Sequence, residues 1–314
     1  NLALFCLEKK RRGGPIYMER LSRLMNSEDL TFIRSSRDTN FLKIFIETIF
    51  NNKVIFLGSG VLGALLGICL FYKIKKGILI HTPLDQLSKK SKFIIFLFLK
   101  SNSNNQLIFV ANHLKNKYEN HFNNKNIFFK SFIIRGLPTM KKLSFTKKNN
   151  NYIKLIFIGG DSEEKGIDFC VELIKYLNLN FPLKYQLHVY GRVKYPKEES
   201  DILFYHQFKK EPFAYYDPQS SIHIMPSIFE GGPLSVLDAA KYGILTIIND
   251  IAAANEMKEN GISSLKIETL NIKKWAKLVN DSKLDLSLSK SIVSQVEVWE
   301  KNVYNSTRKF VTNF

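Results

Sequence analysis

The stretch that decides the fold class spans residues 222–240 and reads IHIMPSIFEGGPLSVLDAA. Its opening, from Ile222 to Met225, is mostly apolar and is typical of a buried strand. A Pro-Ser pair ends that strand and a glycine pair precedes a helix, where Pro233 suits the first helical position because no N–H is needed there. A buried strand, a glycine turn and a helix form the repeating unit of a parallel α/β protein.

The same turn indicates where a ligand would bind. In a parallel sheet the crevice lies at the carboxyl ends of the strands, and the free N–H groups of a helix N-terminus attract anions and hydroxyl groups there. Glu230 lies in the loop before the helix, and Asp238 follows eight residues later in its second turn. Two carboxylates so spaced can bind two different polyols, such as a sugar and a ribose. The competing interpretation makes both of them solvated surface charges.

Strand, turn and helix recur on both sides of this stretch. A polar, basic segment at residues 136–151 has the composition of an interdomain linker. We therefore expect an α/β chain of two Rossmann-like domains, over residues 1–150 and 151–296, with a last helix over residues 297–314. The strands that we expect are residues 2–7, 54–57, 77–80, 107–110, 127–134, 152–158, 186–190, 202–205, 222–225 and 245–249.

Residues 222–240 resemble the E-x7-E signature of the retaining glycosyltransferases called group 1, or family 4, with Asp238 in place of the second glutamate. Three further segments resemble that family in the same order: residues 157–168, with an E-K-G turn, residues 187–191 and residues 246–256. The resemblance covers about residues 152–265. It implies a GT-B fold, in which two Rossmann-like domains face each other across a cleft. The second domain would bind a nucleotide-sugar donor and the first an acceptor.

The resemblance also implies roles for single residues. Glu230 would hold the donor sugar, Lys165 would neutralise the donor diphosphate as a point charge, and Asp238 would hold the nucleotide ribose. His81, at the end of an expected strand, is the candidate for the catalytic histidine of the first domain, and His113 is a weaker one. Further donor-binding positions are Gly231, Gly232, Pro233, Leu234 and Ser235 in the signature turn, Gly13 and Gly14 in the first domain, and Arg192, which would replace a basic residue of the family that is Gly160 here.

No cofactor or metal is expected, because Lys and Arg side chains and helix N-termini stabilise the leaving diphosphate in such enzymes. Three cysteines show neither pairing nor metal-ligand spacing, which fits a reducing compartment. His188, His206 and His223 lie in or beside apolar strands and are expected to be core or strand-edge residues.

The positive charge is concentrated in one half of the chain. Residues 1–150 contain 26 Lys and Arg against 8 Asp and Glu, whereas residues 151–314 contain 20 of each. This asymmetry indicates an anionic partner for the first half. Residues 89–100 place lysines at both ends of a Phe-rich apolar run, which suits either a membrane-interface element or a buried helix. Residues 54–72 are long and apolar enough to be considered as a transmembrane helix, although their glycines favour a strand, turn and helix.

These observations favour a cytoplasmic glycosyltransferase, peripheral on the inner face of the plasma membrane, that acts on a glycan acceptor carried by polyprenyl diphosphate. Bacterial surface polysaccharide, such as O-antigen, lipopolysaccharide or capsule, is the expected product, and nucleic acid is not an expected partner, since no recognised module is present. One alternative is an NAD(P)-dependent oxidoreductase that uses Gly58–Gly63, although the next strand ends in His81 instead of the acidic residue which that fingerprint needs. Another is a GT-B-like protein that binds without catalysing.

Overall fold

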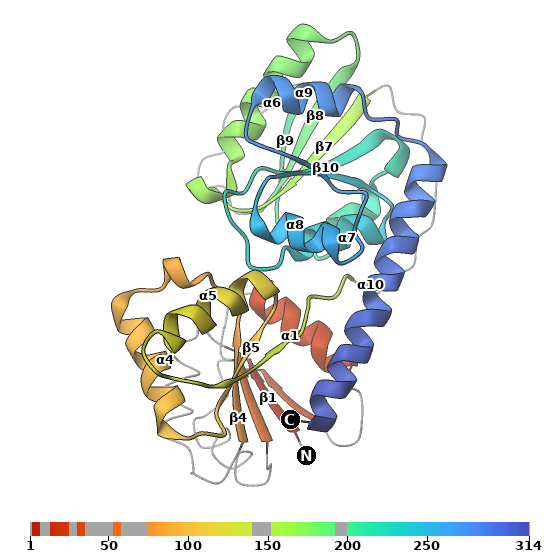
Figure 1. Cartoon of the computed structure of the whole chain (residues 1–314). Helices are drawn as coiled ribbons and strands as arrows, with labels where there is room; N and C mark the ends of the chain where they lie inside the picture. Colours follow the sequence, from red (N-terminus) through yellow and green to blue (C-terminus); the bar gives the residue numbers. More distant parts are fainter. Residues whose placement is uncertain are drawn as a thin grey trace. The chain divides into compact units, whose positions relative to one another are not determined.

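The computed structural model describes residues 2–6, 13–24, 30–34, 53–57, 75–139, 152–191 and 200–313. The chain divides into two compact units, of which unit 1 comprises residues 1–137 and 301–314 and unit 2 comprises residues 138–300. Each unit is built on a six-stranded sheet with helices around it (Figure 1). The strand pairings within both sheets are parallel, which confirms the predicted α/β class.

Unit 1 has the strand order β2-β1-β3-β4-β5-β6. Phe98, Phe109, Tyr118 and Phe122 are fully buried in its core, as expected for a sheet covered by helices. Its elements are β1 (Leu2–Cys6), α1 (Gly13–Leu24), β2 (Leu30–Arg34), β3 (Lys53–Leu57), β4 (Lys75–Ile80), the short 3-10 helix η1 (Leu84–Gln86), α4 (Lys89–Ser101), β5 (Gln106–Phe109), α5 (Asn112–Asn123) and β6 (Lys130–Ile133).

Helix α1 is tied to the segment that follows β6. The buried hydroxyl of Tyr17 donates a hydrogen bond to the carbonyl oxygen of Ile134, and burial raises the pKa of Tyr17. Arg20 donates to the carbonyl oxygen of Leu137 at 2.7 Å. These bonds satisfy carbonyl groups that lie beyond the end of the strand, where no ladder partner remains.

Unit 2 has the strand order β12-β11-β10-β7-β8-β9, so the chain order reverses between β10 and β7. Its elements are β7 (Tyr152–Ile158), η2 (Glu163–Lys165), α6 (Ile167–Asn180), β8 (Lys184–Tyr190), β9 (Leu203–His206), η3 (Pro212–Tyr215), η4 (Pro218–Ser220), β10 (Ser221–Met225), α7 (Leu234–Lys241), β11 (Leu245–Asn249), α8 (Ala252–Glu259), β12 (Lys266–Glu268), α9 (Ile272–Asn280) and α10 (Leu286–Asn313), whose last part belongs to unit 1.

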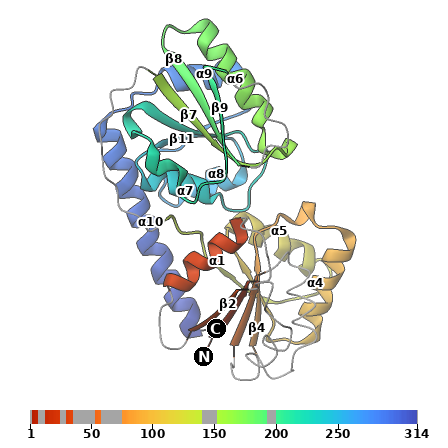
Figure 2. The same ribbon diagram turned by 180° about the vertical axis from the view of Figure 1, so that it is seen from behind.

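The two faces of the unit 2 sheet are covered by different helices. Helices α6 and α9 lie on one face, where Leu155 and Phe157 of β7 pack with Trp275 of α9. Ile156 points to the opposite face and packs with Ala239 of α7, since successive side chains of a strand alternate between faces. Figure 2 shows the same layers from behind. A sheet covered on both faces explains why its strands are continuous apolar runs.

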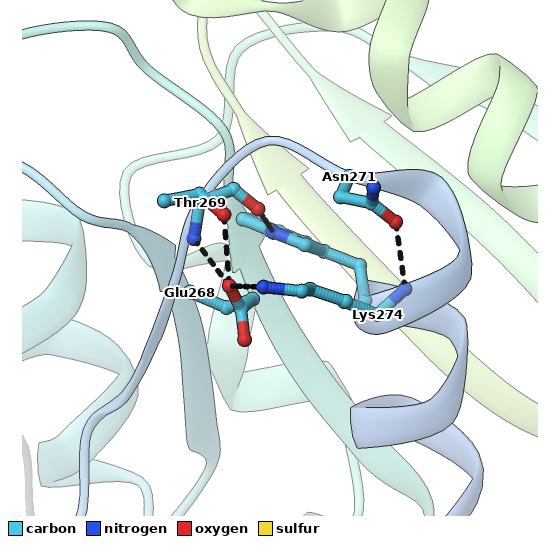
Figure 3. A network of polar contacts seen from close by, with 5 residues as sticks. Glu268, Thr269, Asn271 and Lys274 are labelled. Carbon is cyan, nitrogen blue, oxygen red and sulfur yellow. Dashed lines mark hydrogen bonds and ion pairs between the residues drawn. The ribbon is translucent and has the colours of Figure 1, made fainter.

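A polar network fixes the edge strand β12 to α9 (Figure 3). Oε1 of Glu268 accepts hydrogen bonds from the backbone N–H and the hydroxyl of Thr269, both at 2.9 Å, and from Nζ of Lys274 at 3.1 Å. Oδ1 of Asn271 caps α9 by accepting the N–H of Lys274, and the indole N–H of Trp275 donates to the carbonyl oxygen of Thr269. The Thr269 hydroxyl is the largest cause of the lowered pKa of Glu268.

The structure tests the expectations on membrane segments. Among the described residues no helix is long and apolar enough to cross a membrane. The apolar segment 54–72 begins within strand β3, and its residues 58–72 lie outside the described part of the chain. Residues 89–100 lie in the helix α4, which buries Ile94, Ile95, Phe98 and Leu99 and leaves its opposite face at the surface. The alternative of a buried helix is therefore confirmed for one face of α4, and an interfacial role for the other face stays a prediction.

Candidate functional site

The site of unit 2 forms where the chain order of the sheet reverses. Strands β7 and β10 are parallel neighbours, with Ile156 paired to His223, so the loops that follow them leave from the same edge. The N–H of Ile228, in the loop after β10, donates to the carbonyl oxygen of Glu164, in the loop after β7, at 3.0 Å. A point of reversed order at the carboxyl ends of parallel strands is where open α/β sheets bind ligands.

Gly166 allows these two loops to approach each other. It has a left-handed φ of 73°, which side chains rarely adopt, and it caps the N-terminus of α6. A Cβ added there would lie 3.0 Å from Cγ of Pro226 and 3.1 Å from its carbonyl oxygen. The glycine of the E-K-G turn is therefore required both by its backbone conformation and by its contact with the signature loop.

Lys165 and Glu230 form an ion pair across the two loops. Nζ of Lys165 lies 2.5 Å from Oε1 of Glu230, and the two side chains are 33% and 18% exposed. Lys165 is the last residue of the 3-10 turn η2. Its N–H donates to the carbonyl oxygen of Ser162, and the N–H of the following Gly166 donates to that of Glu163. The arrangement offers a mobile cation that can transfer from Glu230 to an entering anion, and a carboxylate that can then accept hydroxyl hydrogen bonds.

The turn between Glu230 and α7 has the expected outline with one correction. Pro233 is the N-cap of α7 and not its first residue, which is Leu234. Gly231 is buried, Gly232 is exposed, and the hydroxyl of Ser235 donates to the sulfur of Met225 at 3.7 Å. The first turn of α7 thus leaves from the edge of the sheet where β10 ends, so its N-terminal N–H groups lie at the loop that carries Glu230.

Asp238 makes a contact that sequence analysis did not predict. Its Oδ1 accepts the backbone N–H of Thr139 at 2.8 Å, and the hydroxyl of Thr139 donates to Oε1 of Glu211 at 3.1 Å. Burial, followed by the charges of Glu211 and Asp238, raises the pKa of Tyr242 to about 12. Two carboxylates from different segments are therefore joined through one threonine, which lies at the start of unit 2.

The carboxyl ends of β7 and β8 meet through glycine backbone. The N–H of Gly159 donates to the carbonyl oxygen of Tyr190 at 2.9 Å. Gly191 has a φ of 147°, and a Cβ on it would lie 1.8 Å from the carbonyl oxygen of Gly159, a distance that no side chain can satisfy. Arg192 follows directly and lies outside the described residues.

The first-unit candidates lie at the carboxyl edge of their own sheet. His81 directly follows β4 and is half-buried, and His113 is in the first turn of α5, shortly after the neighbouring strand β5. Gly13 and Gly14 are the first two residues of α1. Gly58–Gly63, the fingerprint of the oxidoreductase alternative, lies outside the described residues. In the described ranges no cluster of three His, Cys, Asp or Glu side chains is arranged to hold a metal.

A family model described as "Glycosyl transferases group 1" matches residues 139–297, half of the chain, and includes both loops of this site. The chain belongs to the group 1 glycosyltransferases. The E-K-G turn and the signature loop both lie within the matched residues, and the Lys165–Glu230 pair joins these two segments.

Three proteins illustrate what this group 1 chain is similar to. An uncharacterised 41.2 kDa protein of the cps region of Klebsiella pneumoniae is 22% identical over 135 residues, which are 42% of this chain and 37% of that protein. Anabaena HepE, solved with UDP and glucose, gives a TM-score of 0.72 at 11% identity and covers 99% of this chain and 98% of its own. WaaG, described as a glycosyltransferase of lipopolysaccharide biosynthesis, gives 0.67 at 12% identity with 98% of each chain covered.

These likenesses confirm the GT-B fold, with two Rossmann-like parallel sheets in one chain. The Klebsiella match spans little more than a third of that relative's length. At such low identity a structural likeness carries the fold and not the substrate.

Proposed function

We propose that this group 1 chain is a retaining, family 4 type glycosyltransferase that moves a hexosyl group from a nucleotide-sugar donor to a glycan acceptor. The acceptor hydroxyl would form the new bond to the anomeric carbon and pass its proton to the departing diphosphate oxygen. The bond from that carbon to the donor diphosphate would break, and the nucleoside diphosphate would leave with the negative charge. The parallel with the family rests on the E-K-G turn and the signature loop.

The observation that carries the proposal is the Lys165–Glu230 pair at the reversal point of the unit 2 sheet. A leaving diphosphate needs a cation placed in advance, since a fixed charge stabilises developing negative charge without reorganisation. Lys165 supplies that cation, and its flexible stem allows it to move from Glu230 to a phosphate. Glu230, released from Lys165, would then accept hydroxyl groups of the donor sugar.

Other residues would complete the donor site. Asp238 would hold the ribose, the N–H groups of the turn from Gly231 to Ser235 would bind oxygen atoms, and Arg192 would contact the diphosphate. In unit 1, Gly13 and Gly14 are proposed to take part in donor binding and His81 in catalysis. No metal ion is assigned a role, because Lys165, Arg192 and the N-terminus of α7 supply the positive charge.

The acceptor is proposed to be linked to a polyprenyl diphosphate at the inner face of the plasma membrane, in the assembly of O-antigen or capsule. The excess of basic residues in the first half supports an anionic acceptor or lipid surface. Further support comes from the relatives, since one is encoded in a cps region, one is involved in lipopolysaccharide biosynthesis and one was solved with UDP and glucose.

A thermal-shift screen of the purified chain tests the donor class. UDP-, GDP-, ADP- and dTDP-sugars, NAD and NADP are each added at about a hundredfold excess over Kd, where binding stabilises by about 2.7 kcal/mol and raises Tm by about 5 to 10 °C for a domain of this size. We expect one nucleotide-sugar class to stabilise the protein, and the shift to shrink in Glu230→Ala and Asp238→Ala.

Two outcomes contradict the proposal. Stabilisation by NAD or NADP alone, unchanged in both variants, would place the ligand at Gly58–Gly63 and favour an oxidoreductase. Stabilisation by a nucleotide sugar without release of nucleoside diphosphate, with or without glycan acceptors, would favour a protein that binds and does not catalyse.

A further inference from the structure

Helix α4 has two apolar faces, and only one of them packs on unit 1. The buried face consists of Ile94, Ile95, Phe98 and Leu99. On the outward side Phe93 is 58% exposed and Leu97 is 40% exposed, one helical turn apart. Residues four apart lie above each other on a helix, so the two side chains form one apolar strip. In Figures 1 and 2 the helix lies at the outer margin of its unit.

Lysines frame this strip at both ends. Lys89 and Lys90 are exposed in the first turn of α4, and Lys100 is exposed in its last turn. Positions 89, 93, 97 and 100 follow one another by three or four residues and share one side of the helix. Residues 89–101 contain no acidic side chain. Cations therefore lie beside the exposed apolar strip, with no carboxylate of the same helix to neutralise them.

The aromatic side chains of this face are ordered by one another. Phe93 and Phe96 stack with their ring planes 13° apart and their centroids 6.1 Å apart, and Nζ of Lys100 lies 5.1 Å from the centroid of Phe96. The N-cap Ser88 accepts the N–H of Ser91 at 3.1 Å, which fixes the start of the helix. The outward face is thus a preformed element, so ordering it on a partner costs little entropy.

We infer that the outward face of α4 docks unit 1 on an anionic membrane surface. Phe93 and Leu97 enter the boundary between headgroups and acyl chains, while Lys89, Lys90 and Lys100 contact lipid phosphates. An exposed apolar strip with lysines along its margin is the composition of an interfacial helix. This docking surface goes beyond the proposed function. Only its purpose, which is to bring a lipid-linked acceptor within reach, rests on that function.

Charge complementarity favours a lipid surface over a second copy of this chain. A stable homodimer interface buries at least about 1,000 Å² and has few charges in its centre. The strip of α4 exposes two apolar side chains among three lysines, and a copy of the same face would bring like charges together. A membrane surface accepts a small apolar insertion and many phosphate contacts at once.

Vesicle co-sedimentation of the full chain tests the inference. The probes are phosphatidylcholine vesicles and vesicles with equal parts of phosphatidylcholine and phosphatidylglycerol. We expect binding to the anionic vesicles only, weakened by salt. Phe93→Ser with Leu97→Ser should lower the partition coefficient at least about tenfold, and each of Lys89→Gln and Lys100→Gln should lower it about fivefold.

The matched control is Leu179→Ser with Leu183→Ser in unit 2, where both side chains are exposed, at 85% and 50%. These changes remove the same kind of surface without altering α4 and should leave vesicle binding unchanged. Equal binding of wild type and the Phe93/Leu97 variant would overturn the inference. So would a loss of vesicle binding in the control, or a change of oligomeric state in the Phe93/Leu97 variant without a change in vesicle binding.

The outcome is separable from that of the proposed function. The nucleotide-sugar thermal shift depends on unit 2 residues and should be the same in wild type and in the Phe93/Leu97 variant. Vesicle binding through α4 without any thermal shift by a nucleotide sugar would support the docking surface and contradict the proposed glycosyltransferase activity. A shift without vesicle binding would reject the docking surface alone.

Discussion

Nζ of Lys165 lies 2.5 Å from Oε1 of Glu230, although 65 residues separate them in the chain. Glu230→Gln keeps the size of the side chain and removes its charge. A partly exposed ion pair stabilises a fold by about 0 to 1 kcal/mol, so we expect a small change in the free energy of unfolding. We expect turnover of the donor to fall at least about 100-fold, because the carboxylate that we propose to accept hydroxyl groups of the reacting sugar loses its charge. Denaturant unfolding and initial rates measure the two effects.

A second ion pair in unit 2 provides the control. Nζ of Lys241 lies 2.5 Å from Oε2 of Glu300, and these side chains are 14% and 29% exposed. Glu300→Gln should cost as much stability as Glu230→Gln and leave turnover unchanged. If both variants lost activity to the same extent, the Lys165–Glu230 pair would have a structural role only.

Gly166→Ala tests whether the contact between the two loops matters for donor binding. A left-handed φ costs a residue with Cβ about 1 to 2 kcal/mol, and Cγ of Pro226 would lie only 3.0 Å from the new methyl group. We expect a loss of about 1 to 3 kcal/mol in the free energy of unfolding and at least about a tenfold weaker donor affinity, since Lys165 is the preceding residue. Calorimetric titration with the stabilising nucleotide sugar measures the affinity.

Gly243→Ala is its matched control. Gly243 has a φ of 68°, and a Cβ on it would lie 3.1 Å from Cβ of Ser289, outside the donor loops. Its stability loss should equal that of Gly166→Ala while donor affinity stays at the wild-type level. Equal affinity losses in both variants would mean that general destabilisation, and not the loop contact, weakens binding.

The fold could be predicted from sequence because buried parallel strands consist of continuous runs of apolar residues. The expected strands agree with the structure to within three residues at each end, apart from β2 and β12, which were not predicted. Strand β12 is only Lys266–Glu268, with a charged residue at each end. It is defined by its pairing to β11 and by the network around Glu268, and neither of these leaves a periodic signal.

The site could be predicted only in part, for a physical reason. Glu230, Lys165 and Gly166 stand in motifs whose residue types are dictated by charge and backbone conformation. Thr139 reaches Asp238 through its backbone N–H, a group that every residue except proline has, across 99 positions of chain. Such a contact has no sequence signature, and Glu211 likewise carries none.

Asp238 is predicted to hold residue 139 independently of any role with a nucleotide. In Asp238→Ala the acceptor of the Thr139 N–H is lost, so exchange of this amide with solvent should quicken at least about tenfold. Asp238→Asn keeps an oxygen acceptor, and its amide exchange should stay near that of wild type. Hydrogen exchange followed by mass spectrometry, on peptides that include residue 139, makes the measurement.

Donor affinity of the same two variants separates anchoring from ribose binding. Thr139→Val removes the hydroxyl bond to Glu211 and keeps the N–H, so it controls for the threonine side chain. If Asp238→Asn bound the donor as wild type does while Asp238→Ala did not, the residue would act through the position of Thr139. Fast exchange of the Thr139 amide already in wild type would contradict the anchoring bond itself.

His188 is predicted to make unit 2 sensitive to mild acid. Its Nδ1 lies 3.0 Å from Nε2 of His206, with the ring planes 2° apart, so the two imidazoles share one N–H···N hydrogen bond. Burial lowers the pKa of His188 to about 4, and the charges of His206 and Lys154 add to this. The neighbouring Tyr190 and Tyr216 have raised pKa values and stay neutral. The folded pKa is thus below the ordinary value of 6.5, and the unfolded chain takes up the proton first.

The contribution of His188 to the free energy of unfolding should therefore be fully present above about pH 6.5 and be lost as the pH drops toward about 4. At pH 5 the loss due to His188 should be about 1 to 2 kcal/mol once solvent access to the partly exposed ring is allowed for. His188→Phe should remove this share of the pH dependence, whatever its effect at neutral pH. Buried His223, whose pKa burial lowers to about 3, keeps its own share in both proteins. Denaturant unfolding at pH 7, 6 and 5 gives the slopes, and parallel slopes for wild type and His188→Phe would show that His188 takes up its proton equally in both states.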